Sequence, residues 1–208
     1  MFVKPNIYKV TCTDGSYVYA IRNEHGITLI DTHFPGKGEE IAAELKAAGL
    51  EPVDRILLTH SDMDHTGNAA YLQKLYDCPV YLSAREMEAV QDPAKSKSGK
   101  DDPFSGIERP KLSVFDSDDI AGITVIPAYG HTWGHVCFLF DGALFAGDLL
   151  CTEDGIIKEM ELRYIRDREE SWRAIKSVDA VATFDLLCPS HGEPLSCSKL
   201  EVGEWRQS

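Results

Sequence analysis

The sequence lacks the features of several protein classes. Its six cysteines form no C-x-x-C pair, no block of lysine and arginine occurs, and no window approaches the roughly 18 consecutive apolar residues of a membrane span. The formal net charge of −13 would repel a nucleic-acid backbone. We therefore expect no nucleic acid and no membrane as partners, and we expect free thiols rather than disulfides.

The sequence also has no tract dominated by proline, glycine or serine, and 43% of its residues are hydrophobic. This composition is typical of a globular protein, and 208 residues can bury a core without disulfides. Residues 1–6 lack the apolar segment and the cleavage site of a secretion signal, which predicts a cytoplasmic location. We expect a single domain over residues 1–208, with one long loop at about 91–111.

Apolar patterning predicts an α/β protein in two halves, each with strands before helices. The first half opens as an antiparallel meander. Strands are expected at 7–12, 17–22, 27–30, 53–58 and 80–82, and helices at 39–48, 69–76 and 84–90. In the second half, strands are expected at 112–115, 123–128, 136–140, 143–146 and 186–188, and a helix at 169–178. A sandwich with helices outside two central sheets fits this order.

Histidine and aspartate gather at the ends of four apolar runs, which is where α/β proteins place their sites. These side chains are also ligands for zinc, iron and manganese, so they predict a metal centre. The alternative for the segment 59–67 is a solvated turn in which Asp64 caps a helix N-terminus, and the other three strand ends argue against it. The candidate metal ligands are His60, Asp62, Asp64, His65, His131, Asp148 and His191.

Five segments resemble the motifs of the metallo-β-lactamase superfamily in order and spacing. They are Thr-His-Ser-Asp-Met-Asp-His at 59–65, Gly-His-Thr-Trp-Gly-His at 130–135, Ala-Gly-Asp at 146–148, Pro-Ser-His-Gly at 189–192 and the early Asp31. The resemblance covers essentially the whole chain. It implies a four-layer αββα sandwich with two divalent metal ions, zinc first and iron or manganese as alternatives.

The resemblance also implies a role for each ligand. The first metal would be held by His60, Asp62 and His131, and the second by Asp64, His65 and His191. Asp148 would bridge the two ions, Asp31 would orient ligands through hydrogen bonds, and Asp64 and Asp148 would be the catalytic residues. Most members have histidine where this chain has Asp62, so this position departs from the family pattern. Flavodiiron proteins have glutamate there and bind iron.

The leading function is a hydrolase in which a metal-bound hydroxide attacks a small ester, lactone, thioester or phosphoester. Asp62 motivates a rival, a di-iron oxidoreductase resembling the flavodiiron catalytic domain. Only residues 192–208 follow His191, so its flavin would have to come from a partner. A binding module without turnover is disfavoured because all seven positions retain residues able to bind metal. The expected partner is a small-molecule substrate, and a homodimer is retained as a candidate assembly.

Several neighbouring residues leave alternatives open. For His135 a structural role is favoured over a role as a hydrogen-bond donor to the substrate. His33 could equally reach the entrance of the metal site or be an exposed turn residue. Tyr129 and Tyr164 fit packing better than polarisation of a carbonyl. In the long loop, Lys95, Lys97 and Lys100 could attract an anion, but nearby aspartates favour a solvated loop.

Overall fold

In the computed structural model, which describes residues 1–95, 102–115 and 117–202, the chain first builds a seven-stranded sheet in sequential order. Its first four strands pair antiparallel, and the last three are added in parallel. The strands are β1 (Phe2–Lys4), β2 (Ile7–Lys9), β3 (Tyr19–Asn23), β4 (Gly26–Ile30), β5 (Arg55–Leu57), β6 (Val80–Ser83) and β7 (Leu112–Phe115).

The second half builds a five-stranded sheet in the order β14-β11-β10-β9-β8. Only the pair β11 and β14 is parallel, and β14 lies beside β11 at one edge of this sheet. The strands are β8 (Asp119–Ile120), β9 (Ile123–Pro127), β10 (Val136–Phe140), β11 (Ala143–Gly147) and β14 (Leu186–Pro189). A separate hairpin is formed by β12 (Leu150–Glu153) and β13 (Ile156–Glu159).

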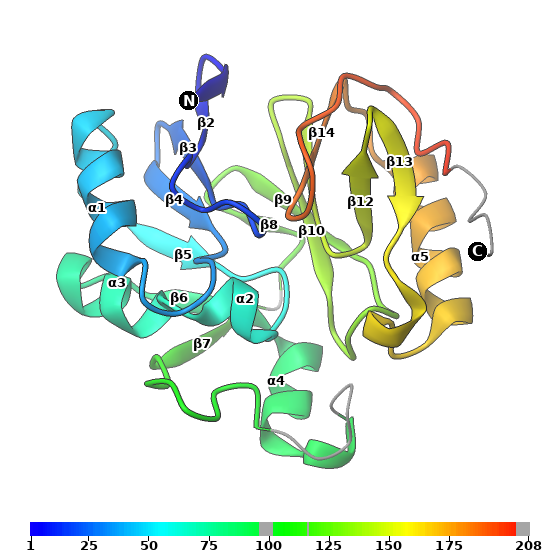
Figure 1. The fold of residues 1–208 in the computed structure, drawn as a ribbon, viewed down its shortest axis with the longest axis horizontal. Coiled ribbons are helices and arrows are strands. Elements are labelled where there is room, and N and C mark those ends of the chain that lie inside the picture. The colour runs from blue at the N-terminus through cyan, green and yellow to red at the C-terminus, as the bar shows by residue number, and fades with distance from the viewer. Residues whose placement is uncertain (96–101, 116, 203–208) are drawn as a thin grey trace.

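Helices cover the outer faces of the two sheets (Figure 1). The first sheet is covered by α1 and α3, and the second by α5. The helices are α1 (Gly38–Ala47), α2 (Met63–Thr66), α3 (Ala69–Tyr76), α4 (Ala84–Gln91) and α5 (Arg168–Val181), with 3₁₀ turns η1 (Pro93–Lys95) and η2 (Leu162–Tyr164). In the part of the chain that the structure describes, no helix has both the length and the apolar character needed to cross a bilayer.

The alternation of side chains along the strands produces three apolar layers. In β3, Ala20 faces the helices on the outside of the first sheet, whereas Tyr19 and Ile21 face the second sheet. Phe138 and Phe145 of the second sheet meet them in the central layer. A third layer packs α5 against the outer face of the second sheet. The predicted four-layer αββα sandwich is therefore confirmed.

The main difference from the sequence-based expectation is the hairpin of β12 and β13, which was missed. Its turn contains Asp154 and Gly155, both with positive φ, and Asp-Gly is a strong hairpin signal. The short strands β1 and β8 were missed as well. Within the expected loop 91–111, η1 and residues 102–111 are described, whereas Lys97, Lys100 and the rest of 96–101 lie outside the described residues. All six cysteines are free, as expected.

Candidate metal centre

The predicted ligands meet where strands of both sheets end. His60 follows β5, Asp62 precedes α2, and α2 itself contains Asp64 and His65. From the second sheet, His131 follows β9, Asp148 follows β11 and His191 follows β14. The parallel neighbours β11 and β14 bring their carboxyl ends to the same edge of the sheet. Residues far apart in the sequence therefore converge, although none of the seven lies within a strand.

One group lies around His60 and His131, whose side chains are almost fully buried. Oδ2 of Asp62 lies 3.6 Å from Nε2 of His60 and 3.4 Å from Nε2 of His131. Nε2 of His131 is in turn 3.3 Å from Oδ2 of Asp148. The ligand atoms of His60, His131 and Asp148 are mutually within 4.8 Å, which suits a shared ion, and Asp62 adjoins this group.

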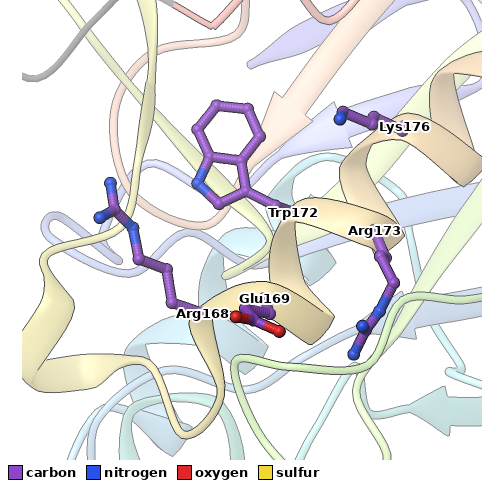
Figure 2. Close-up of a pocket in the computed structure, with 5 residues that line it drawn as sticks. All are labelled: Arg168, Glu169, Trp172, Arg173 and Lys176. Carbon is purple, nitrogen blue, oxygen red and sulfur yellow. The ribbon is translucent and has the colours of Figure 1, made fainter.

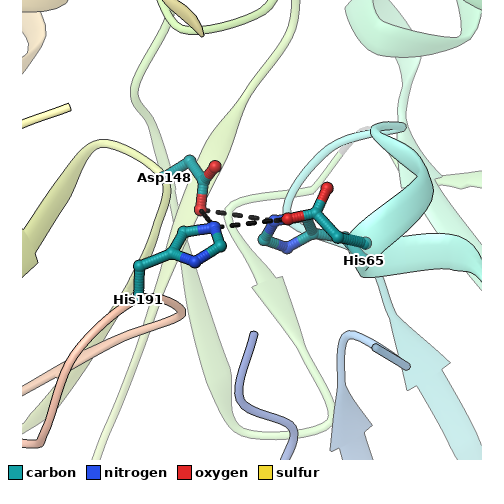
Figure 3. A group of neighbouring side chains, drawn as sticks. His65, Asp148 and His191 are labelled. Atoms are coloured by element: carbon teal, nitrogen blue, oxygen red, sulfur yellow. Dashed lines mark ion pairs between the residues drawn. The ribbon is translucent and has the colours of Figure 1, made fainter. Parts of the chain in front are cut away.

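A second group shares Asp148 and includes Asp64, His65 and His191. Oδ1 of Asp148 lies 3.3 Å from Nε2 of His65 and 3.2 Å from Nε2 of His191. Oδ2 of Asp64 contacts the same two nitrogens at 3.3 and 3.2 Å. Figure 3 shows the side chains of His65, Asp148 and His191 pointing toward one another. The two carboxylate oxygens of Asp148 thus face different groups.

Asp31 orients a histidine in each group. Its Oδ2 accepts a hydrogen bond from Nδ1 of His65 at 2.9 Å and from the Thr59 hydroxyl at 2.8 Å. Since that hydroxyl has only one proton, its oxygen accepts from Nδ1 of His60 at 2.9 Å. Both rings therefore turn Nε2 toward the carboxylates. Asp31 reaches this position from a left-handed backbone conformation (φ 60°), which aspartate tolerates better than most residues.

A backbone carbonyl orients the third histidine. Nδ1 of His191 donates to the Gly15 oxygen at 2.5 Å, so its Nε2 also faces the carboxylates. Tyr17 supports the same loop, because its amide donates to the Ser190 oxygen and its hydroxyl donates to Glu193. The segment before β3 therefore holds the end of β14 in place.

The ionisation of the second group is strongly perturbed in the metal-free chain. Burial would lower the pKa of His191, but its contacts with Asp148 and Asp64 raise that pKa to about 10. Burial also opposes the charge on His65, yet the surrounding aspartates raise its pKa well above the ordinary value. Burial would raise the pKa of Asp148, but His65 and His131 hold it well below its usual range. Protons therefore occupy the nitrogens that would otherwise bind metal.

The donor set fits two metal ions. Nε2 of His60 and Nε2 of His65 are buried without a hydrogen bond and have only carboxylate oxygens as near polar neighbours, so a metal ion that displaces their protons would give both nitrogens a partner. Each group combines imidazole nitrogen with carboxylate oxygen, which suits zinc, iron and manganese. The outer nitrogens of the same histidines already have acceptors, as is usual for rings that bind metal.

The structure separates the alternatives for two other histidines. Nε2 of His135 accepts from the Asp148 amide at 3.1 Å, and burial together with His60 and His131 lowers its pKa well below the ordinary value. This geometry favours the structural role. The interpretation of His33 as an exposed turn residue is wrong, because the side chain is buried and its Nδ1 donates to the Ser16 oxygen. Its φ of 64° lies in the left-handed region.

The tyrosines and the loop lysine have ordinary surroundings. The Arg85 guanidinium lies 3.9 Å from the ring centroid of Tyr129, so this ring serves packing. Tyr164 is part of the exposed turn η2, and Lys95 forms an ion pair with Glu88 at 2.6 Å. None of these contacts brings the three side chains into either group of candidate metal ligands.

Sequence reasoning missed Thr59 and Glu86, which support the centre. The pattern Ser83-x-x-Glu86 indicates a helix cap, and Ser83 does accept from the Glu86 amide. The Glu86 side chain, however, reaches the two segments that contain His60 and His131. Gly130 has a related role, because a Cβ there would lie 2.1 Å from the Ser171 nitrogen of α5.

A hollow of about 460 Å³ lies elsewhere, on the face of α5 (Figure 2). None of the seven converging residues lines it, and all of its lining residues belong to the one helix. They are Arg168, Glu169, Trp172, Arg173 and Lys176. The chemistry that the sequence predicted therefore belongs to the strand-end cluster and not to this hollow.

Comparison with known proteins agrees with this site. The family model described as the metallo-beta-lactamase superfamily matches residues 13–191. A probable metallo-hydrolase of Streptococcus pyogenes is 32% identical over 164 residues, which cover 74% of this chain and 67% of the relative. A hydroxyacylglutathione hydrolase of Shewanella halifaxensis is 33% identical over 140 residues, or 64% of this chain. That match spans only 46% of the relative, about half its length.

Solved structures show the same fold. The protein TTHA1623, crystallised in a di-iron-bound form, has a TM-score of 0.66 and 27% identity, with 87% of this chain and 89% of that chain covered. An archaeal metallo-beta-lactamase superfamily protein from Sulfolobus tokodaii has a TM-score of 0.70 at 18% identity, covering 92% of this chain and 81% of that chain. At that identity the second likeness concerns the fold alone.

Proposed function

Since the chain belongs to the metallo-beta-lactamase superfamily and is a metal-dependent hydrolase, we propose that its seven converging side chains hold two divalent metal ions. His60, Asp62 and His131 would form the first position, and Asp64, His65 and His191 the second. Asp148 would bridge them. The observation that supports this proposal most is the position of the Asp148 carboxylate. Its Oδ2 faces His131, whereas its Oδ1 faces His65 and His191.

Bound divalent ions supply an activated water and polarise the scissile group. The chain's own residues hold the geometry in which this can happen. Asp31 and Thr59 fix His60 and His65, and the Gly15 carbonyl fixes His191. His135, uncharged and buried, fixes the backbone of Asp148. Because these partners are in place without metal, little reorganisation is needed when the ions bind.

The proposed substrates are small esters, lactones, thioesters or phosphoesters. Similarity to proteins named hydroxyacylglutathione hydrolase supports placing a hydroxyacyl-glutathione first among the compounds to test. Phe34 and Met63 expose apolar surface next to His33 and between Asp62 and Asp64, which suits an apolar group on the substrate. The catalytic residues would be Asp64 and Asp148.

Zinc is the proposed metal, with iron or manganese as alternatives. Asp62 adds a hard oxygen donor to the first position, which improves its fit to iron and manganese. The di-iron-bound relative at 27% identity supports the same alternatives. These two observations also keep a second function under test, a di-iron oxidoreductase that takes electrons from a flavin-containing partner.

The decisive experiment is elemental analysis followed by an activity panel. Protein purified without added metal, and again after reconstitution with zinc, iron or manganese, should approach two ions per chain. Each form is then assayed on a hydroxyacyl-glutathione, lactones, carboxylic esters and phosphoesters. Oxygen uptake with an added reduced flavoprotein is measured beside them. A reproducible value near zero ions after reconstitution would contradict the two-ion centre, and oxygen uptake without hydrolysis would favour the oxidoreductase.

A further inference from the structure

Glu86 is a buried carboxylate outside the five segments that resemble the family motifs. It lies in the first turn of α4 and is 1% exposed. Its Oε1 accepts hydrogen bonds from the Ser61 amide at 3.1 Å and the Ser61 hydroxyl at 2.6 Å. Its Oε2 accepts from the Thr132 hydroxyl at 2.9 Å and the Gly134 amide at 2.6 Å. Both oxygens are therefore used by donors from other segments.

The position of these donors is informative. Ser61 stands between His60 and Asp62, and Thr132 directly follows His131. The Glu86 carboxylate thus joins two segments. One contains His60 and Asp62 and the other contains His131, which are the proposed residues of the first metal position apart from the bridging Asp148. One segment follows β5 of the first sheet, and the other follows β9 of the second. None of the four donors belongs to Asp64, His65 or His191.

The surrounding backbone shows that this connection is closely fitted. The Ser83 hydroxyl donates to the Gly134 oxygen at 2.6 Å and accepts from the Glu86 amide at 3.0 Å. A Cβ at Gly134 would lie 2.1 Å from the Glu86 nitrogen, so only glycine allows the segment to approach α4. Because burying a carboxylate is costly, four donors are needed to retain it here.

We propose that Glu86 is a positioning residue that sets the separation of His60 and Asp62 from His131, and so the affinity and geometry of the first metal position. The second position depends on Asp31 and the Gly15 carbonyl instead. This inference rests on the two-ion centre proposed above. It predicts that a change at Glu86 weakens one metal position selectively, which a general loss of stability would not do.

The test is a Zn²⁺ titration of Glu86→Gln in competition with a chromophoric chelator. Glutamine keeps the shape but replaces one acceptor oxygen by an NH₂ group, which faces an N–H or O–H donor. The first-position affinity should fall by roughly 10–100-fold, the usual cost of losing an outer hydrogen-bond partner, while the second changes little. The Asp62→Ala variant identifies which of the two dissociation constants belongs to the first position.

Glu44→Gln is the matched control. Glu44 also accepts four hydrogen bonds, from the Tyr8 hydroxyl, the Thr11 amide and hydroxyl, and the Cys12 amide, but it touches neither metal-binding segment. It should lower thermal stability and leave both zinc affinities unchanged. Equal weakening of both positions in Glu86→Gln, or unchanged affinities, would overturn the inference.

If Glu86→Gln does not fold, Thr132→Val removes a single one of the four bonds. A smaller, still selective weakening of the first position is then expected, and unchanged affinity overturns the proposal. The wild-type titration separates this inference from the proposed function. A wild-type chain that binds fewer than two ions overturns both the proposed function and this inference. If the wild type binds two ions and Glu86→Gln has the same zinc affinities, only the role of Glu86 is overturned.

Discussion

The two proposed metal positions are supported in different ways. In the first, Glu86 joins the segments that contain the ligands, and the histidine His60 is oriented indirectly through Thr59. In the second, each histidine has an acceptor of its own, Asp31 for His65 and the Gly15 carbonyl for His191. The first position therefore depends on how two segments are held together, and the second on individual ring orientations. The two should fail separately when their supports are removed.

The largest effect is expected from the residue that the two positions share. Asp148→Ala should weaken both ions and remove more hydrolysis than Asp62→Ala, which should weaken the first ion and largely spare the second. The loss for Asp148→Ala should exceed the roughly 10–100-fold cost typical of an outer hydrogen-bond partner. Zinc stoichiometry and kcat/KM of the two variants provide the check. Equal loss of both ions in the two variants would contradict the bridging role.

The next effect distinguishes direct from relayed orientation. Asp31→Asn removes the negative charge opposite His65 and the Thr59 hydroxyl and can place an NH₂ group there. The zinc affinities of both positions should therefore fall by about 10–100-fold. Thr59→Val removes the hydroxyl that links His60 to Asp31 but keeps the contact between Asp31 and His65, so it should weaken the first position alone. Competitive zinc titration measures both variants. If Thr59→Val weakens the second position as much as Asp31→Asn does, the relay through Thr59 is wrong.

A smaller effect concerns the charge of the first position. Two divalent ions with Asp62, Asp64 and Asp148 give a site of net charge +1, and Asp62→His would raise it to +2. The acid limb of the pH–rate profile should therefore move down by about one unit or more, with turnover retained. Profiles of both forms loaded with the same metal test this. An acid limb that stays in place would remove the charge argument.

The smallest effect is expected in the stability of the metal-free chain. The pKa of His191 is raised to about 10 in the folded chain, from 6.5 in the unfolded chain. Its contribution to the free energy of unfolding is therefore complete below pH 6.5 and is lost as the pH rises toward 10. The lowered pKa of Asp64 gives a contribution that is present above 3.8 and lost as the pH falls further. Denaturant unfolding of the metal-free chain should thus show greatest stability between about pH 4 and 6.5.

His191→Asn should flatten the alkaline part of that profile. Glu44→Gln should lower the profile without changing its slope above pH 6.5. A metal-free wild-type chain whose stability rises between pH 6.5 and 9 would contradict the assigned direction. This pH profile also tests the difference between the two proposed metal positions, because the second position contains the histidines whose protons compete with metal.

Much of the architecture could be predicted from the sequence because it depends on local patterns. The strand at 136–140 and the helix that ends before Gly49 follow directly from apolar periodicity and a left-handed glycine. The seven converging residues could be named because they stand at strand ends and in motifs of known spacing. Their roles as metal ligands stay a prediction until metal is measured.

The supports of the site could not be predicted, because they depend on contacts between distant segments. Nothing local distinguishes Glu86 from an ordinary residue of a capped helix, and only the folded chain brings it to Ser61 and Thr132. The two alternatives for His33 could not be separated from the sequence for a similar reason. A turn residue is usually exposed, but the side chain of this one is buried and its Nδ1 donates to the Ser16 oxygen.

The close approach of Gly130 to α5 and of Gly134 to α4 has a consequence for laboratory evolution of this protein. Between these two glycines, His131, Thr132 and Trp133 form a span with no room for even a methyl group at either end. A library that randomises this span would consist mostly of unfolded or metal-free chains. Substrate range is better altered at exposed side chains such as Phe34 and Met63, where a change in size displaces water rather than another helix.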